Sequence, residues 1–492
     1  MDFYALIFFL IYSALKPQEW PGFDWIISFK PNQVAMLLGI IALFQRPVGL
    51  RLKDIFRVPH DTFFFLYIAW IILGAPSPYD TFKSFQVHIV TYIVAQQALR
   101  TVDRMIKFLV AWSLILMTVT LLALDGDYGL DLLGSNRLTE GFMKGRMILN
   151  ISIYNNPNTL AHTLVPVIPM LFFLLFWKKS LGKFWGVLLI FPLWCIFETE
   201  SKGAFLCTFA ALVFTMAFGR PKWVQLGILI VTFSLGTSVL YLMPRMSELN
   251  KSTKGNEAIQ GRVAALQFGL RVMKNTWTGL GPGLFVPNFV KAHNYPKAAH
   301  NAYCQNGAEL GRIGLGLFLA MMYCCFRSLV SIRTSSDDEE RLRRTMFVML
   351  AAYAMSCWMV DFAYRTTFFL LLAMCSALHR HCAGINKLID KEVNDDEAIA
   401  QLPAWQRNRA VRAQQATAQP GLQPVEAVSS MPLRWQGPAS VVELHSDDVR
   451  LEDEGGPLPR VGWMRFTWVD FVANLGLLYG VERMWAYLIT KM

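Results

Sequence analysis

Residues 104–124 read RMIKFLVAWSLILMTVTLLAL, and this apolar run decides the fold class. It is about as long as the roughly 20 residues that a helix needs to cross the hydrocarbon core of a bilayer. Similar runs follow one another along the chain up to residue 379, although several are shorter than a perpendicular span needs. The sequence therefore predicts an all-α integral membrane fold with about twelve transmembrane helices. The runs cover residues 3–15, 32–45, 62–78, 85–99, 104–124, 159–177, 184–197, 203–218, 222–242, 307–330, 346–363 and 366–379.

The composition favours one polytopic membrane domain, expected over residues 1–380. Of 492 residues, 54% are hydrophobic and 16% are charged, which argues against a soluble chain of about three domains. The first apolar run lacks a basic flank and a small-residue cleavage site, so we interpret it as a membrane helix and not as a signal peptide. The net charge of +11 does not indicate nucleic-acid binding, because the cations lie in short loops between apolar helices. Eight scattered cysteines without a CxxC pair predict buried free thiols and no metal site.

The distribution of Lys and Arg orients the helices. With the N-terminus in the cytoplasm, every short connection on the cytoplasmic side is basic, as the positive-inside rule requires. On the opposite side, the short loops near 79–84 and 198–202 carry little charge of this kind, with Lys83 in the first and Lys202 in the second. Two long loops remain outside, 125–158 and 243–306, and the second is predicted as a large periplasmic loop between helices 9 and 10. The basic connections are 46–61, 100–107, 178–183, 219–222 and 331–345.

The C-terminal part of the chain differs from the membrane domain. Residues 381–460 are polar, with Gln, Ala, Pro and acidic runs, and they lack an apolar periodicity. A disordered cytoplasmic tail is therefore expected there. Residues 461–492 are apolar and aromatic again, which is typical of an interfacial amphipathic helix or a peripheral anchor.

The stretch 261–314 contains most of the residues that carry chemistry. It holds, in order, an arginine, a glycine-rich turn, a His-Asn pair and a glutamate. This pattern closely resembles the shared domain of O-antigen ligases and O-antigen polymerases. In that family an Arg-bearing amphipathic segment, a Gly-Xaa-Gly-Xaa-Gly-like turn and an Ala-His-Asn motif form the large periplasmic loop, and the next helix opens with a Glu and glycines. The matching residues are Gly261, Arg262, Trp277, Gly279, Gly281, Gly283, Ala299, His300, Asn301, Glu309, Gly311 and Gly314.

Two weaker matches lie upstream. Residues 155–161 are similar to the family's Asn-Pro-Asn segment, and residues 199–204 to its Ser-Arg-Gly segment. Lys202 stands where the family usually has arginine, so the charge is kept while the bidentate phosphate geometry is lost. The resemblance covers about residues 1–380 in topology and 140–315 in motifs.

The resemblance implies an inverting transferase in the bacterial inner membrane, with its active site facing the periplasm. The donor would be a glycan on a polyprenyl diphosphate, and the acceptor a lipid A core, a protein or a growing polysaccharide. Membrane lipids would surround the protein, and neither a metal nor a cofactor is expected. A lipid diphosphate leaves readily once its charge is held, so fixed cations can carry much of the catalysis.

The candidate catalytic residues follow from that chemistry. Arg262 and Lys202 are predicted to hold the diphosphate, and Arg146 is predicted to join them as a substrate-binding residue. His300 is the candidate base, since its unperturbed pKa near 6.5 suits proton abstraction from a sugar hydroxyl. Asn301 either holds the ring tautomer of His300 or caps the helix that begins near residue 302.

Two further positions belong to the predicted substrate site. Gly281 lies in the glycine-rich turn, which by itself is a weak phosphate-binding signal because no Gly-Lys-Ser/Thr follows it. Glu309 is expected either to pair with Arg262 or to stabilise the start of its helix.

Three other functions remain open at the level of sequence. A polymerase of the same family would use the same motifs. A twelve-helix solute transporter would be expected to show paired interrupted helices in two halves, which the sequence does not show. A metal-dependent oligosaccharyltransferase would use Asp125 and Asp127, although a solvated turn is the simpler explanation of this pair.

Overall fold

The computed structural model describes residues 2–45, 52–134, 137–138, 145–177, 182–242, 254–401 and 460–491. The chain divides into two compact units. The first contains residues 1–383 together with 461–492, and the second contains residues 384–460. Most of the predicted tail lies outside the described residues, and its described part is the helix α19 (Ile385–Gln401).

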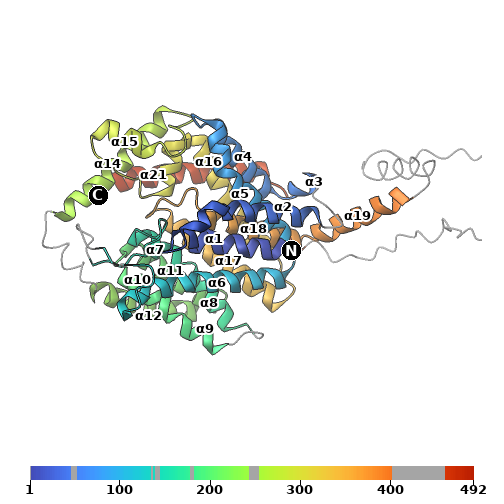
Figure 1. The fold of residues 1–492 in the computed structure, drawn as a ribbon, viewed down its shortest axis with the longest axis horizontal. Helices are drawn as coiled ribbons and strands as arrows, with labels where there is room; N and C mark the ends of the chain where they lie inside the picture. Colours follow the sequence, from blue (N-terminus) through green and yellow to red (C-terminus); the bar gives the residue numbers. More distant parts are fainter. Residues whose placement is uncertain are drawn as a thin grey trace, which may run out of the picture. The chain divides into compact units, whose positions relative to one another are not determined.

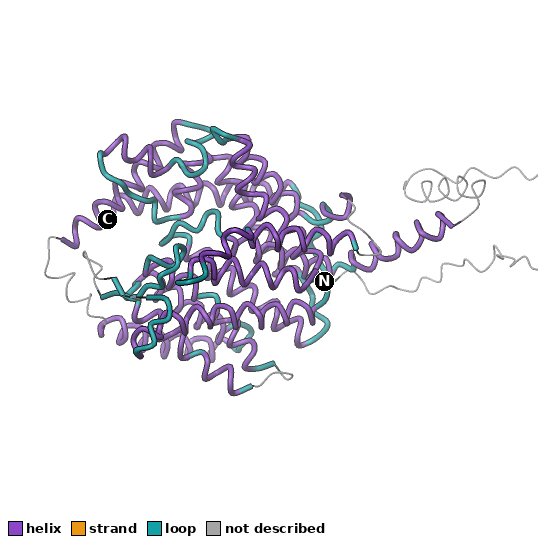
Figure 2. Tube along the Cα trace, viewed as in Figure 1, coloured by secondary structure: helices purple, strands orange, loops and turns teal. Residues whose placement is uncertain are grey.

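The described regular structure is helical apart from two isolated β-bridges, which confirms the predicted all-α class (Figures 1 and 2). Short 3₁₀ turns at Pro17–Glu19, Asp24–Phe29 and Asp125–Tyr128 join some of the helices. The helices of the first unit are α1 (Asp2–Leu15), α2 (Pro31–Phe44), α3 (Leu52–Ile55), α4 (Pro59–Leu73), α5 (Pro78–Ala98), α6 (Val102–Leu124), α7 (Pro157–Leu164), α8 (Val167–Leu175), α9 (Lys183–Leu188), α10 (Ile190–Glu198), α11 (Lys202–Ala217), α12 (Lys222–Leu242), α14 (Lys254–Asn275), α15 (Phe285–His293), α16 (Ala302–Ser331), α17 (Asp337–Ser356), α18 (Thr366–Cys382) and α21 (Trp468–Lys491).

Several of these helices are suited to a bilayer. Three described segments are long and apolar enough to cross it, namely Val102–Tyr128, Pro157–Leu175 and Ala302–Ser331. A fourth candidate results if α18 and the start of α19 are counted together. Shorter apolar helices include α2, α4 and α11. The length and hydropathy of these helices indicate a membrane protein. The count of twelve transmembrane helices stays a prediction.

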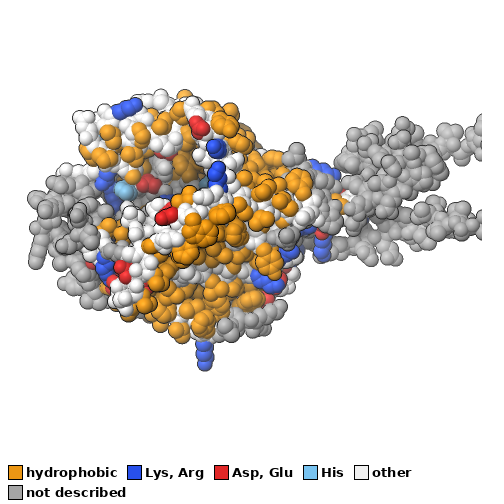
Figure 3. All heavy atoms as spheres, viewed as in Figure 1, with side chains coloured by type: hydrophobic (Ala, Val, Ile, Leu, Met, Phe, Trp, Pro, Cys, Tyr) orange, Lys and Arg blue, Asp and Glu red, His pale blue; other side chains and the backbone are white. Residues whose placement is uncertain are grey.

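The outer surface of the first unit exposes many large hydrophobic side chains. Large side chains such as Leu37 and Ile41 on α2 and Ile230 and Phe233 on α12 are exposed. Figure 3 shows hydrophobic side chains over much of the visible face of this unit, with scattered charged side chains among them. Because contiguous apolar patches of this extent are rare on soluble monomers, lipid is the natural solvent for this face.

One end of the helix bundle gathers segments of the loops predicted to lie outside, together with two turns that the predicted runs included, and we call it the motif end. It consists of the loops 74–77, 145–156, 199–201, 276–301 and 357–365. Arg146 Nε donates to the carbonyl of Thr199 at 2.7 Å, and the N–H of Ala302 donates to the carbonyl of Cys357 at 2.7 Å. Loops that are far apart in the sequence therefore meet at this end.

The opposite end gathers the basic connections, and we call it the basic end. It consists of the loops 55–58, 98–101, 218–221, 332–336 and 460–466. Arg344 Nη1 donates to the carbonyl of Phe218 at 3.2 Å, and His381 Nδ1 lies 3.2 Å from the carbonyl of Arg100. The two sets of loops are thus kept apart by the length of the helices.

The C-terminal helix α21 packs along α16. Near the basic end, Tyr323 donates to Asp470 Oδ1 at 2.6 Å. Further along, Asn474 Nδ2 donates to the carbonyl of Gly316 at 3.1 Å. Towards the motif end, Trp485 is 1% exposed and its Nε1 donates to the carbonyl of Leu266 on α14 at 3.0 Å.

These contacts run in opposite directions along the two helices, so α21 lies antiparallel to α16. The segment 461–492, predicted as an interfacial helix, therefore packs on the bundle over most of its length and belongs to the first unit.

Candidate active site

His300 lies at the end of the loop that leads into α16. Its backbone is left-handed, with φ of 49°, and its side chain is half-buried. The following residue, Asn301, is extended, and its Oδ1 accepts from the N–H of Cys304 at 2.9 Å. This contact is a helix N-cap, so of the two predicted roles of Asn301 the structure shows the cap.

Asp361, in the loop between α17 and α18, positions His300. Its Oδ1 accepts from the N–H of Asn301 at 3.2 Å, and its Oδ2 lies 3.6 Å from Nδ1 of His300. In the sequence, Asp361 lies four residues before Arg365 and far from the histidine. Its place beside His300 is a tertiary contact between residues sixty-one positions apart, with no local signal in the sequence.

The surroundings of this pair keep the His300 ring neutral near pH 7. Burial, with a smaller contribution from the positive charges of Arg262 and Lys297, lowers the pKa of His300 to about 4. Burial also raises the pKa of Asp361 to about 6, against the opposing effect of the N–H groups of His300 and Asn301. A neutral imidazole next to a carboxylate is the state that a general base requires.

Two cations lie beside the pair. Arg262 is on α14, and its charge acts on the pKa of both His300 and Lys297. A Cβ placed on Gly261 would lie 3.2 Å from Nζ of Lys297. The ammonium group of Lys297 therefore packs against Gly261, the residue that precedes Arg262. Burial and the nearby Arg262 lower the pKa of Lys297. Because like charges are costly side by side, this arrangement favours a bound anion.

Lys297 is a residue that the sequence reasoning missed. The signal available was its place three residues before His300, in the same predicted periplasmic loop. Its proximity to Arg262 could not be foreseen, because it arises from the packing of that loop against α14.

Lys202 opens α11 at the same end of the bundle. The adjacent Gly203 lets the helix start approach its neighbours closely, since a Cβ there would lie 3.2 Å from Nε2 of His162 and 3.0 Å from Cγ of Met359. His162 is in electrostatic range of Arg262. Lys202 therefore begins a helix that borders the 357–365 loop, and Asp361 lies in this loop.

Arg146 is buried, with 2% of its surface exposed. Its Nε donates to the carbonyl of Thr199, and its Nη2 donates to Oδ1 of Asn158 at 3.0 Å. The hydroxyl of Ser201, the N-cap position of α11, donates to the same oxygen at 2.9 Å. Arg146 thus braces the starts of α7 and α11, and this burial does not favour its predicted contact with substrate.

The glycine-rich turn has a structural role in the described arrangement. At Gly311 the helix α16 is broken by a backbone with φ of 68° and ψ of −169°. The N–H groups of Leu280 and Gly281 donate to the carbonyls of Ala308 and Glu309 at 2.9 and 2.8 Å. The N–H of Gly281, proposed from sequence as a substrate contact, is thereby already donated to α16.

Glu309 fastens this turn to the rest of the site. Its Oε1 accepts from the N–H of Phe285 at 3.1 Å, and its Oε2 accepts from the hydroxyl of Tyr364 at 2.8 Å. These contacts differ from the two roles expected from the sequence, because the carboxylate links the start of α15 to the 357–365 loop.

Asp125 and Asp127, the acidic pair in the first long loop, accept hydrogen bonds from other protein groups. Arg137 donates from Nε and Nη2 to both carboxylate oxygens of Asp127, at 2.9 and 2.7 Å. Asp125 Oδ2 accepts from the N–H of Leu132 at 3.1 Å. Within the described ranges, no group of three or more His, Cys, Asp or Glu side chains is arranged to hold a metal ion.

Comparison with known proteins identifies the central part of the chain. Residues 187–319 match the family model described as O-antigen ligase. The matched segment includes Lys202, Arg262, Lys297 and His300 and ends before Asp361. No curated protein and no solved structure matches the chain. Over residues 187–319 the chain is therefore similar to the O-antigen ligase family.

Proposed function

We propose that this protein transfers a glycan from a polyprenyl diphosphate to an acceptor at the periplasmic face of the bacterial inner membrane. The observation that carries the proposal is the His300–Asp361 pair, set beside Arg262 and Lys297 at the motif end. A base and a cluster of cations are the two components that a metal-independent transfer from a diphosphate needs.

The chemical step assigns a role to each group. The acceptor hydroxyl attacks the anomeric carbon, forming a new C–O bond while the bond to the diphosphate oxygen breaks. His300 takes the hydroxyl proton, and Asp361 orients the ring and stabilises its positive charge. Attack from the face opposite the leaving group inverts the anomeric centre.

The cations act on the leaving group. Negative charge on the diphosphate grows as the glycosidic bond breaks, so a fixed cation stabilises the transition state more than the bound donor. Arg262, Lys202 and Lys297 are the proposed cations. Lys202 contacts a phosphate less well than an arginine would, because it has no fork of donors. Lys297 adds a second ammonium group that compensates in part for this loss.

The placement in the membrane follows from charge. The basic end, rich in Lys and Arg, faces the cytoplasm by the positive-inside rule, and the motif end then faces the periplasm. A polyprenyl-linked donor would reach the site from the outer leaflet. Ligase and polymerase differ here in the acceptor alone, so lipid A core, protein and growing polysaccharide are all candidate acceptors.

The test is transfer by purified protein in liposomes, supplied with a polyprenyl-diphosphate-linked glycan and each acceptor class in turn. We expect product with one acceptor, with inverted anomeric configuration, and undiminished transfer in excess chelator. Loss of activity on chelation, restored by Mg²⁺ or Mn²⁺, would contradict the metal-independent mechanism. Unchanged surface glycans after deletion of the gene, together with no transfer by folded protein, would contradict the function itself.

A further inference from the structure

A cavity of about 280 Å³ lies at the basic end, between α8, α11 and α17. Its wall is partly apolar and aromatic, with Phe172 and Phe176 from α8 and its C-cap, and Met216 from α11. Phe176 is 52% exposed and Met216 is 40% exposed. The cavity is therefore bordered by the apolar side surface of the bundle.

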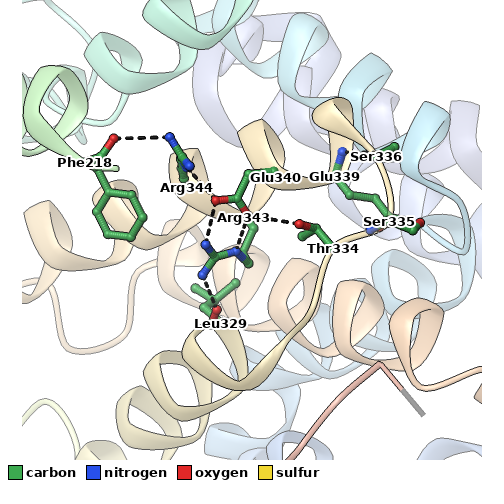
Figure 4. A network of polar contacts seen from close by, with 9 residues as sticks. All are labelled: Phe218, Leu329, Thr334, Ser335, Ser336, Glu339, Glu340, Arg343 and Arg344. Atoms are coloured by element: carbon green, nitrogen blue, oxygen red, sulfur yellow. Dashed lines mark hydrogen bonds and ion pairs between the residues drawn. The ribbon is translucent and has the colours of Figure 1, made fainter. Parts of the chain in front are cut away.

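Arginines line the rest of the cavity, and Arg344 is the best fixed of them. Its Nε donates to Oε1 of Glu340 at 2.6 Å and its Nη1 to the carbonyl of Phe218 (Figure 4). Gly219 has φ of 75°, and a Cβ on it would collide with this guanidinium. The glycine therefore makes room for the arginine in the cavity wall.

Arg341 and Arg220 are held less firmly. Nη1 of Arg341 is buried and has no hydrogen-bond partner among the described residues. Arg220 is exposed at the rim. No Asp or Glu is among the described residues that line the cavity, and the nearby Glu340 is shared between Arg343 and Arg344. The cavity thus presents an excess of positive charge and a buried donor that lacks an acceptor.

We infer that this cavity binds the phosphate-bearing headgroup of an anionic membrane phospholipid. The arginines offer donors to phosphate oxygens, for which guanidinium geometry is well suited. The exposed phenyl and thioether groups at the border would contact the first part of an acyl chain. Basic pockets between helices on the cytoplasmic side of a membrane are the usual form of such sites.

The size and the place of the cavity support a lipid as the occupant. Its volume is near the lower limit of small-molecule sites, which suits a headgroup whose chains remain in the bilayer. It lies at the opposite end of the helices from His300, so it is separate from the proposed transfer site. The inference does not depend on the proposed function.

The experiment is a lipid titration of the purified full-length protein, followed by native mass spectrometry. The probes are phosphatidylglycerol, phosphatidylcholine and inorganic phosphate. We expect phosphatidylglycerol to bind more tightly than phosphatidylcholine, and inorganic phosphate to compete weakly. Arg341→Gln should weaken phosphatidylglycerol binding about fivefold or more, since one cation near a membrane contributes about 1 kcal/mol.

Two further variants make the outcome decisive. Arg220→Gln changes an exposed side chain, should fold normally and should also weaken binding. Arg333→Gln removes an exposed cation of the same end that does not line the cavity, and it should leave binding unchanged. Equal affinity for the two lipids, or equal losses in Arg333→Gln and Arg341→Gln, would overturn the inference. Inorganic phosphate binding as tightly as phosphatidylglycerol would show a soluble anion as the ligand and would overturn it too.

Discussion

His300 is placed by three segments that are distant in the sequence. The loop before α16 carries it, the 357–365 loop brings Asp361 to its Nδ1, and α14 adds the charge of Arg262. The helix cap by Asn301 fixes the backbone that follows. A histidine so constrained has one ring nitrogen directed to a carboxylate, which leaves Nε2 as the atom for proton transfer.

Replacement of His300 should slow the chemical step and spare donor binding. We expect His300→Ala to lower turnover about 10²- to 10⁴-fold, the usual contribution of a general base. The measurements are donor affinity and single-turnover rate in membrane-inserted protein. His293→Ala is the matched control, because that ring stacks on Phe289, with ring centroids 4.2 Å apart, away from the pair. Near-normal turnover in His300→Ala would remove the base from the mechanism.

Arg262 should contribute to both donor binding and catalysis. Arg262→Ala is expected to weaken both, because the charge on the diphosphate is present in the bound donor and grows in the transition state. Arg262→Lys should recover a part of the activity, since it keeps the charge and loses the fork of donors. The comparison of kcat and KM for the two variants checks this. Full activity of Arg262→Ala would contradict the phosphate role.

Lys297 should set the pH dependence of the reaction. Burial is the main cause of the low pKa of the His300 ring, about 4, and the charges of Arg262 and Lys297 add to this effect. In Lys297→Gln the pKa of His300 should rise, so activity should be lost at a higher pH on acidification. The pH profile of kcat/KM measures this shift, with the exposed Lys291→Gln on α15 as control. An unshifted acidic limb would show that Lys297 does not act on His300.

At the scale of the elements, the break in α16 and the helix α21 together shape the site. The break at Gly311 leaves carbonyls that the glycine turn and Nε1 of Trp70 satisfy, the latter with Leu310 at 2.9 Å. On its other side α16 receives α21, whose Trp485 also touches α14 near Gly269. Trp485 thus joins α14, which carries Arg262, to α16, which begins just after His300.

Truncation of Trp485 should therefore affect stability and activity together. Trp485→Ala removes the hydrogen bond to Leu266 and opens a cavity beside α14, and large-to-small changes of this kind cost on the order of 3 kcal/mol. We expect a lower thermal transition and weaker transfer. Tyr487→Ala is the control, since Tyr487 is on the same helix and is 57% exposed. Equal behaviour of the two variants would show that α21 does not hold α14.

At the scale of the whole molecule, the two ends of the bundle should face different compartments. Lys291→Cys on α15 belongs to the motif end, and Arg333→Cys belongs to the basic end. A membrane-impermeant thiol reagent should label the first in intact spheroplasts and the second after membrane disruption. All eight native cysteines are buried, so the background should be low.

The same experiment tests α21 as a crossing helix. Thr490→Cys, at the end of α21 near the motif end, should be labelled together with Lys291→Cys. Labelling of Thr490→Cys together with Arg333→Cys would contradict a crossing by α21. Reversed labelling of the two loop positions would contradict the periplasmic placement of the site.

The sequence alone predicted the helical class, the membrane character and the resemblance to O-antigen ligases. Hydropathy is a sum over neighbouring residues, so a run such as 104–124 predicts its own environment without knowledge of the fold. The glycines and the His300-Asn301 pair likewise form a local pattern that a family model recognises. Charges in short loops predicted which loops would share an end of the bundle.

Only the tertiary structure decided how the site is composed. In the structure Asp361 lies beside His300, and Lys297 packs against Gly261. The glycine segment, expected from the sequence to contact phosphate, donates its N–H groups to carbonyls of α16. The structure also showed Arg146 as a buried brace and placed α21 against α16. These relations join residues that are far apart in the sequence, and they depend on which surfaces pack together. No local sum over neighbouring residues contains that information.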